Sequence, residues 1–372
     1  MLRRFARVGL LFCVILAGSA CFATNYWVSV GSGGYYQKIP VPSSSSVYLI
    51  EMDQFGNVLR GPTEVVSGEQ FGKYPSRVTA IANKDQSTLF LWVLSGYGED
   101  ALTAQGFPGF PIHRVLVNKN SMTGSAVQTI MFPKDAQYLQ ASQAGPLFLA
   151  AQKPYESAKG FFLTANGMYN GASVRLNPRV DEGAHQASVS ADGRVCVAVD
   201  DDGDDRIYYQ RLATYSSSPP VRPIGAPVVV ASRPGTLEAL DVTGPLAGGK
   251  RFVVYVEDEP FDQEHRGPSD RQEEPDDITY LQVVTEAGQK LGKPIVVNIP
   301  SNRTTDPQSL AIDPDGTFVL LTLNGDDYGC PYKDLVVYQA LDATGHPTGP
   351  LKQITSCDTM SGEALGIDIL KQ

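Results

Sequence analysis

The sequence predicts an all-β protein made of a repeated unit of four short antiparallel strands, which we call a to d in chain order. Short apolar runs alternate with turns, and the 372-residue chain contains 36 Gly and 26 Pro. Segment 364–371 supplies strand a of a unit whose strands b to d lie within 26–66. Sheets of this kind bury both faces only by stacking on one another around an axis. We therefore expect a single six-bladed β-propeller of four-stranded antiparallel blades, closed by pairing 364–371 with 26–66. A seven-bladed ring is the alternative.

Residues 1–23 predict an export signal. Three arginines precede the apolar run 8–17, and small residues follow it. This pattern directs secretion, and it is too short for a permanent membrane span. Cleavage after Ala23 would give a periplasmic or secreted protein. Cys21 leaves a second interpretation open, a lipoprotein anchored to the membrane through that cysteine.

Residues 24–372 are predicted to form one propeller domain. The strands a are expected near Thr79, Leu139, Ala187, Leu240, Leu310 and Leu365. The expected blades are 364–371 with 25–72, 73–133, 134–178, 179–232, 233–300 and 301–358.

A recurring hairpin defines strands c and d. An apolar strand ends in a glycine turn, and Gly-Pro or Gly-x-Pro opens the next strand, as at Gly56 and Gly61-Pro62. Gly288 and Gly292-Lys-Pro294 repeat the pattern. Because proline cannot donate a backbone hydrogen bond, strand d is predicted at the outer edge of each blade.

A second hairpin joins strands a and b through a tight Asp-Gly turn, read in Ser190-Ala-Asp-Gly193 and in Asp313-Pro-Asp-Gly316. Together with Asp200–Tyr208, these turns resemble the WD40-like (PD40) repeats of TolB-type six-bladed propellers. The resemblance covers mainly 185–212 and 308–340. It implies a six-bladed ring and an exported protein with a protein-binding role.

Long polar segments are expected between strands b and c. In a propeller these segments share one face with the d–a connections, and long loops gathered on one face commonly carry function. The residues expected to contact a partner on this face are Tyr97, Asp258, Glu273, Asp327 and Tyr328.

Three cysteines lie beyond the export signal, at a spacing that does not fit a zinc site. Cys196 falls in an apolar strand pattern and is expected in the core. Cys330 precedes a strand c and Cys357 follows the neighbouring strand d. Since export permits disulfides, we expect a Cys330–Cys357 bond, with two free thiols as the alternative.

The acidic segment 200–205 is the candidate metal site. Asp200, Asp202 and Asp204 alternate as in some calcium loops, but the EF-hand pattern is not met. A solvated turn is the alternative interpretation. Ca2+ is therefore a candidate ligand, and the sequence establishes no cofactor.

The charge of the chain disfavours nucleic acid as a partner. Removal of residues 1–23 takes away three arginines and no acidic residue, so the net charge of −10 becomes −13, which repels nucleic acid and anionic lipid. A membrane contact is expected only if Cys21 is lipidated. The sequence leaves the oligomeric state open.

The predicted function is non-enzymatic binding of a protein, peptide or glycan through the long b–c loops, because none of the nucleophile, metalloprotease or phosphate-loop motifs is found. The alternative is a metal-dependent enzyme of the lactonase, hydrolase or sugar dehydrogenase type with an acidic axial site. Its candidate catalytic residues are Glu182, His185, Asp306 and Asp326, with Asp200 at the metal.

Overall fold

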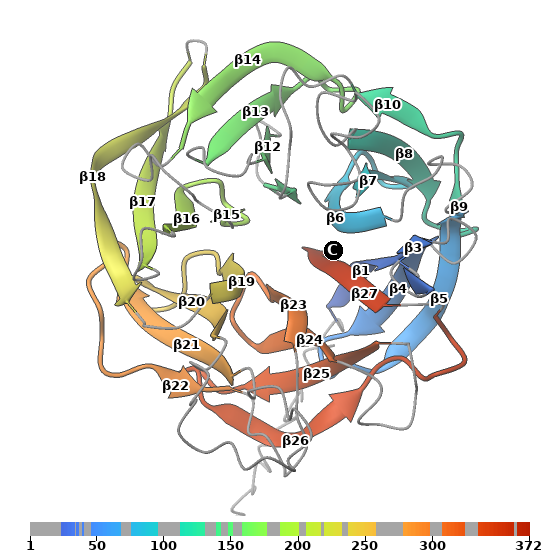
Figure 1. Cartoon of the computed structure of the whole chain (residues 1–372). Helices are drawn as coiled ribbons and strands as arrows, with labels where there is room; N and C mark the ends of the chain where they lie inside the picture. The colour runs from blue at the N-terminus through green and yellow to red at the C-terminus, as the bar shows by residue number, and fades with distance from the viewer. Residues whose placement is uncertain are drawn as a thin grey trace, which may run out of the picture.

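The computed structural model describes these residues: 24–33, 35–36, 39–40, 46–67, 76–95, 112–130, 139–142, 148–151, 158–176, 187–200, 206–216, 219–232, 237–257, 278–297, 307–323, 334–360 and 363–372. They form antiparallel sheets arranged in a ring, with the first strand of each sheet near the axis and the last at the rim (Figure 1). The fold is an all-β propeller with several blades.

The strands of each sheet follow one another from the axis outward. The closing sheet contains β27 (Glu363–Lys371), β1 (Asn25–Gly33), β4 (Ser46–Asp53) and β5 (Val58–Ser67). The next two contain β6 (Ser76–Asn83), β7 (Thr88–Ser95), β8 (Ile112–Asn118), β9 (Thr123–Gly124) and β10 (Gln128–Ile130), and then β11 (Gln140–Ala141), β12 (Phe148–Ala151), β13 (Lys159–Leu163) and β14 (Tyr169–Arg175). A separate short hairpin pairs β2 (Tyr35–Tyr36) with β3 (Ile39–Pro40).

The second half of the ring repeats the arrangement. Its sheets contain β15 (Ala187–Val189), β16 (Val195–Asp200), β17 (Arg206–Thr214) and β18 (Val221–Ser232), then β19 (Leu237–Val242), β20 (Lys250–Glu257), β21 (Ile278–Thr285) and β22 (Ile295–Val296), and finally β23 (Pro307–Ile312), β24 (Phe318–Leu323), β25 (Leu335–Leu341) and β26 (Pro347–Gln353).

The two ends of the chain close the ring, as the sequence predicted. β27 pairs antiparallel with β1, and the register sets Leu370 opposite Trp27 and Ile367 opposite Val30. Figure 1 shows β27 in red beside the blue β1. The C-terminal strand therefore serves as the inner strand of a sheet whose other strands come from the start of the described chain.

The number of strands departs from the expectation in one sheet. Within the described residues, five sheets of the ring have the expected four strands, while the sheet that contains β8 has five. Both β9 and β10 pair with β8. Ser125 lies between them: its N–H donates to Leu116 O at 2.7 Å, and its hydroxyl accepts the N–H of Leu116 at 3.0 Å. Because a side chain takes the place of a backbone acceptor there, the outer strand is divided.

The core lies between neighbouring sheets. One cluster of buried side chains joins Val28 and Ile50 of the closing sheet to Phe318 and Leu320 of the last sheet in the chain. The β24 strand is buried along its whole length, because its sheet is covered on both faces. Stacking of the sheets thus supplies the apolar contacts that one isolated sheet lacks.

Candidate functional site

The connections between strands differ in length on the two faces of the ring. Between strands b and c, β20 ends at Glu257 and β21 begins at Ile278, and β7 ends at Ser95 while β8 begins at Ile112. Between strands a and b, β6 ends at Asn83 and β7 begins at Thr88. We call the side of the b–c and d–a connections the loop face and the side of the a–b and c–d turns the turn face. The long connections gather on the loop face.

The sequence-predicted site residues lie on or beside these connections, and nearly all fall outside the described residues. Those outside are Tyr97, Glu182, His185, Asp202, Asp204, Asp258, Glu273, Asp306, Asp326, Asp327, Tyr328 and Cys330. Asp200 is described only as the last position of β16. Among the described residues, no group of three or more His, Cys, Asp or Glu side chains could hold a metal ion.

The described part of the axis contains a cluster of polar side chains that the sequence did not reveal. We call Gln140, Ser188, Asp241 and Asp368 the axial cluster; each comes from the inner strand of a different sheet. Asp241 Oδ1 accepts hydrogen bonds from Ser188 Oγ at 2.7 Å and from Gln140 Nε2 at 2.9 Å. One carboxylate thus joins the inner strands of three sheets.

Three members of the cluster bind the backbone of the next inner strand. Asp368 Oδ2 accepts a hydrogen bond from the N–H of Ile81 at 2.9 Å. Gln140 Oε1 accepts one from the N–H of Val189 at 2.7 Å. Asp241 Oδ2 accepts one from the N–H of Ile312 at 2.8 Å. The residues just before these three amides are small: Ala80, Ser188 and Ala311. Long acceptors therefore alternate with small side chains around the ring, and this arrangement leaves room for every acceptor.

Burial governs the electrostatics of the cluster. Burial raises the pKa of Asp241 above its usual range. Hydrogen bonds donated by Ile312, Ser188, Gln140 and Val242 act in the opposite direction and lower this pKa, but burial has the larger effect. Burial also raises the pKa of Asp368 well above its usual range, and the neighbouring Asp241 carboxylate adds to that rise. Both side chains line an axial cavity of about 20 Å³, which is about the size of one water molecule.

A groove of about 320 Å³ lies on the turn face, opposite the expected surface. Its lining includes Leu246, Phe252 and Leu341, with Lys250 and Asp342 among the polar lining residues. The carboxylate of Asp342 is engaged by its own turn, since it accepts from Thr344 N–H at 2.8 Å.

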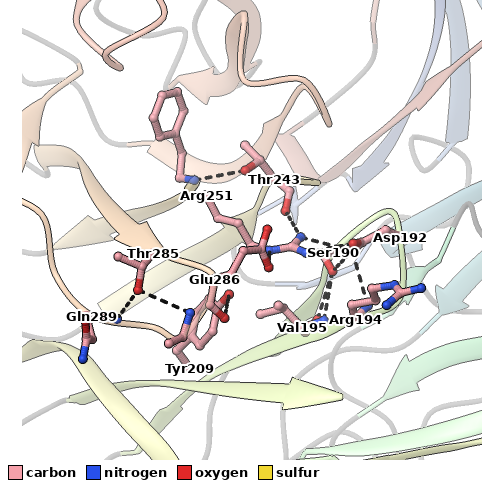
Figure 2. Close-up of polar contacts among 12 residues, drawn as sticks. Ser190, Asp192, Arg194, Val195, Tyr209, Thr243, Arg251, Thr285, Glu286 and Gln289 are labelled. Atoms are coloured by element: carbon pink, nitrogen blue, oxygen red, sulfur yellow. Dashed lines mark hydrogen bonds and ion pairs between the residues drawn. The ribbon is translucent and has the colours of Figure 1, made fainter. Parts of the chain in front are cut away.

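A buried arginine, paired with two partly exposed carboxylates, joins two neighbouring sheets near the turn face. Arg251 of β20 donates to both carboxylate oxygens of Asp192, at 3.1 and 2.8 Å, and to Glu286 at 3.0 Å (Figure 2). It also donates to Thr243 O at 3.0 Å. Asp192 belongs to the Asp-Gly turn on which the repeat resemblance rests, so this turn has a packing role in the structure.

Two further titratable side chains of the described residues, His113 and Cys196, lie in the core. His113 lies within β8, and burial lowers its pKa to about 4, so the imidazole is neutral at pH 7. Cys196 is a buried free thiol of β16, as expected for a core residue, and burial raises its pKa to about 12. Cys357 is disulfide-bonded. Within the described residues, no helix is long and apolar enough to span a membrane.

Sequence comparison gives no relative: no family profile and no curated protein matches the chain. Solved structures do match. Kuenenia stuttgartiensis hydrazine synthase has a TM-score of 0.44 at 14% identity, covering 82% of this chain and 80% of that one. A "putative 6-phosphogluconolactonase" from Bacteroides uniformis has a TM-score of 0.49 at 13% identity, with 89% and 82% covered. The Dos1 propeller has a TM-score of 0.41 at 13% identity, and the match covers 76% of this chain and 63% of that one. At these identities the likeness concerns the fold alone.

Proposed function

We propose that the protein is an exported, non-enzymatic propeller that binds a protein, peptide or glycan through its loop face. The observation that carries the proposal is the uneven distribution of connections: the b–c connections from β7 to β8, from β20 to β21 and from β24 to β25 are long, while the a–b turns are short. A rigid ring that bears its long segments on one side presents them together to a partner.

The axial cluster supports a binding site on the face of the ring. The cavity at Asp241 and Asp368 has room for about one water molecule, and the Asp241 carboxylate is already occupied by donors from neighbouring sheets. A peptide or a sugar is far larger than this cavity. Such a partner would therefore lie outside the axial cavity, and we propose that it lies against the b–c segments of the loop face.

Three finer features belong to the same proposal. If the five-stranded sheet counts as one blade beside the five four-stranded sheets, the ring has six blades, as in the WD40-like, TolB-type propellers.

We also propose that Cys330 is the partner of Cys357. That bond would fix the b–c segment between β24 and β25. An export signal at 1–23 would place the protein in the oxidising compartment that such a bond needs.

The proposal is tested with an immobilised glycan panel and a random peptide display library, each probed with the purified protein. Replacement of 258–277 by a short Gly-Ser linker removes one b–c segment of the loop face. The matched control replaces turn 215–220, between β17 and β18 on the turn face. We expect the first change to weaken binding of the selected ligand at least tenfold and the second to leave it unchanged. Binding that survives the first change and is lost with the second would contradict the proposal.

A Ca2+ site at Asp200, Asp202 and Asp204 is compatible with this function as a structural ion. Oxygen ligands from an acidic segment suit a hard cation. Metal analysis of the purified protein, with the Asp202→Asn variant as control, tests it: the metal content should fall in the variant. Turnover of a lactone or sugar substrate that requires Glu182 or His185 would instead support the enzymatic alternative.

A further inference from the structure

The two carboxylates of the axial cluster have unequal surroundings. Asp241 accepts four hydrogen bonds: Oδ2 accepts from Ile312, and Oδ1 accepts from Ser188, Gln140 and its own neighbour Val242. Asp368 accepts two, from Ile81 and from its own neighbour Ile369. Hydrogen bonds to a carboxylate favour the charged form. The negative charge is therefore better accommodated on Asp241 than on Asp368.

The charges around the axial cavity can be followed among the described residues. The described residues that line it include no Lys, Arg or His. Lys371, further along β27, forms an ion pair with Asp315 rather than with either axial carboxylate. Asp313, the residue after β23, is a further carboxylate, and it accepts hydrogen bonds from Thr317. On the other inner strands, β11 and β15 contribute the neutral Gln140 and Ser188.

The remaining charged residues of the inner strands are Arg77 on β6, Glu238 on β19 and Glu363 on β27. Their side chains lie outside the described residues.

Two buried carboxylates beside one small cavity repel each other, and neither is paired with a cation among the described residues. Taking a second unpaired charge out of water costs several kcal/mol, whereas protonation of one carboxyl removes that cost. We propose that Asp368 is protonated at neutral pH while Asp241 stays ionised, so that the axial cluster is a pH-sensitive junction between the inner strands. The proton comes from the solvent and resides on a carboxyl oxygen of Asp368.

The junction would weaken at higher pH. Burial raises the pKa of Asp368, so the folded protein holds a proton that the unfolded chain releases at lower pH. The stability that this proton provides is complete below the unfolded pKa of about 3.9 and is lost as the pH rises through the folded pKa. Because β27 closes the ring, the loss falls on the contact between β27 and β6.

Substitution by asparagine distinguishes the two carboxyls. An amide mimics a protonated carboxyl, with one oxygen that accepts and one group that donates. The amide group of Asp368→Asn would face one backbone donor, the N–H of its own neighbour Ile369, so this variant should lower the urea midpoint at pH 7 only slightly. Its midpoint should depend less on pH than that of the wild type. Asp241→Asn should shift the midpoint strongly to lower urea, because its amide group would face donors. Equal losses in both variants would overturn the assignment.

Infrared spectroscopy of the wild type provides a test that does not depend on the variants. The folded protein at pH 7 should show a carboxylic acid C=O band that shifts with ¹³C-labelled aspartate and disappears at higher pH. Asp342→Asn, on the turn face, should leave the band unchanged. A folded wild type that lacks this band at pH 7 would refute the proposal, whether or not Asp368→Asn folds.

Discussion

At the scale of single residues, Arg251 joins its own sheet to the neighbouring one through one guanidinium group. Its side chain is 1% exposed, and Asp192 and Glu286 come from turns of different sheets. The Asp-Gly turn was visible in the sequence, but its ionic partner lies 59 positions further along the chain. No local pattern indicates that pairing, because it arises only when two sheets stack.

Removing the carboxylate of Asp192 should destabilise the protein more than removing the whole ion pair. Asp192→Ala leaves a buried guanidinium without its bidentate partner, while Glu286 stays paired with it, so the expected cost is about 1–3 kcal/mol of unfolding free energy. The double variant Arg251→Met with Asp192→Ala should recover much of that loss. Urea denaturation of the single and double variants measures both values, and a purely additive result would contradict the expectation.

The same contact predicts a loss of stability in acid. Although burial opposes it, the hydrogen bonds from Arg251 and Ser190 lower the pKa of Asp192 below its usual range. Its contribution is therefore present above the unfolded pKa of about 3.9 and is lost as the pH falls through the folded pKa. The urea midpoint of the wild type should drop in this range, and that of the double variant should drop less.

At the scale of elements, the glycines of the c–d turns combine backbone conformation with packing between sheets. Gly288 has φ +81°, and a Cβ there would lie 2.7 Å from the Tyr209 ring of the preceding sheet. Gly56 has the same relation to Tyr338. Each tyrosine hydroxyl donates to a carbonyl of the turn it covers, Tyr338 to Gln54 O at 2.8 Å and Tyr209 to Glu286 O at 3.3 Å. These turns fix how neighbouring sheets stack.

Two alanine substitutions separate the backbone effect from the packing effect. Gly288 and Gly292 have nearly equal φ, +81° and +80°, but a Cβ at Gly292 would meet nothing within 4 Å. Gly292→Ala should cost only the left-handed strain of about 1–2 kcal/mol. Gly288→Ala should cost more, because the Tyr209 ring must also move. Thermal or urea unfolding of the two variants compares them, and equal losses would exclude a packing role for the ring.

The sequence predicted these elements unevenly. The inner strands predicted near Thr79, Ala187, Leu240 and Leu310 are confirmed as β6, β15, β19 and β23. They could be predicted because an Asp-Gly turn or an apolar run marks each of them locally. The division of the outer strand at Ser125 was not predicted, because it depends on one hydroxyl that competes with the backbone. The axial cluster was also missed, because its residues are ordinary in their own strands and meet only at the axis.

At the scale of the whole molecule, the two ends of the described chain close the ring. β27 pairs with β1 along its length, and Asp368 within it accepts the amide of Ile81 in the next sheet. The last residue, Gln372, donates its N–H to Asn25 O at 3.0 Å. The two ends of the described chain are thus neighbours, and they take the place that an a–b turn has in the other sheets.

This arrangement predicts that connectivity matters less than the presence of β27. Deletion of 363–372 should abolish the single cooperative unfolding transition, because β1 loses its inner partner and Ile81 its acceptor. A circular permutant that joins Gln372 to Asn25 by a short linker, with new ends in 258–277, should keep a cooperative transition. Calorimetry of both proteins decides the matter, and a deletion variant with unchanged unfolding would contradict it.

The division of labour in the axial cluster has a consequence for engineering. Asp241, Asp368 and Gln140 bond to inner strands, and none of the hydrogen bonds described for them involves a b–c segment. Foreign sequences grafted between β20 and β21, or between β7 and β8, would leave those bonds untouched. The molecule is therefore suited to serve as a display framework, in which these segments are randomised while the axial cluster remains constant.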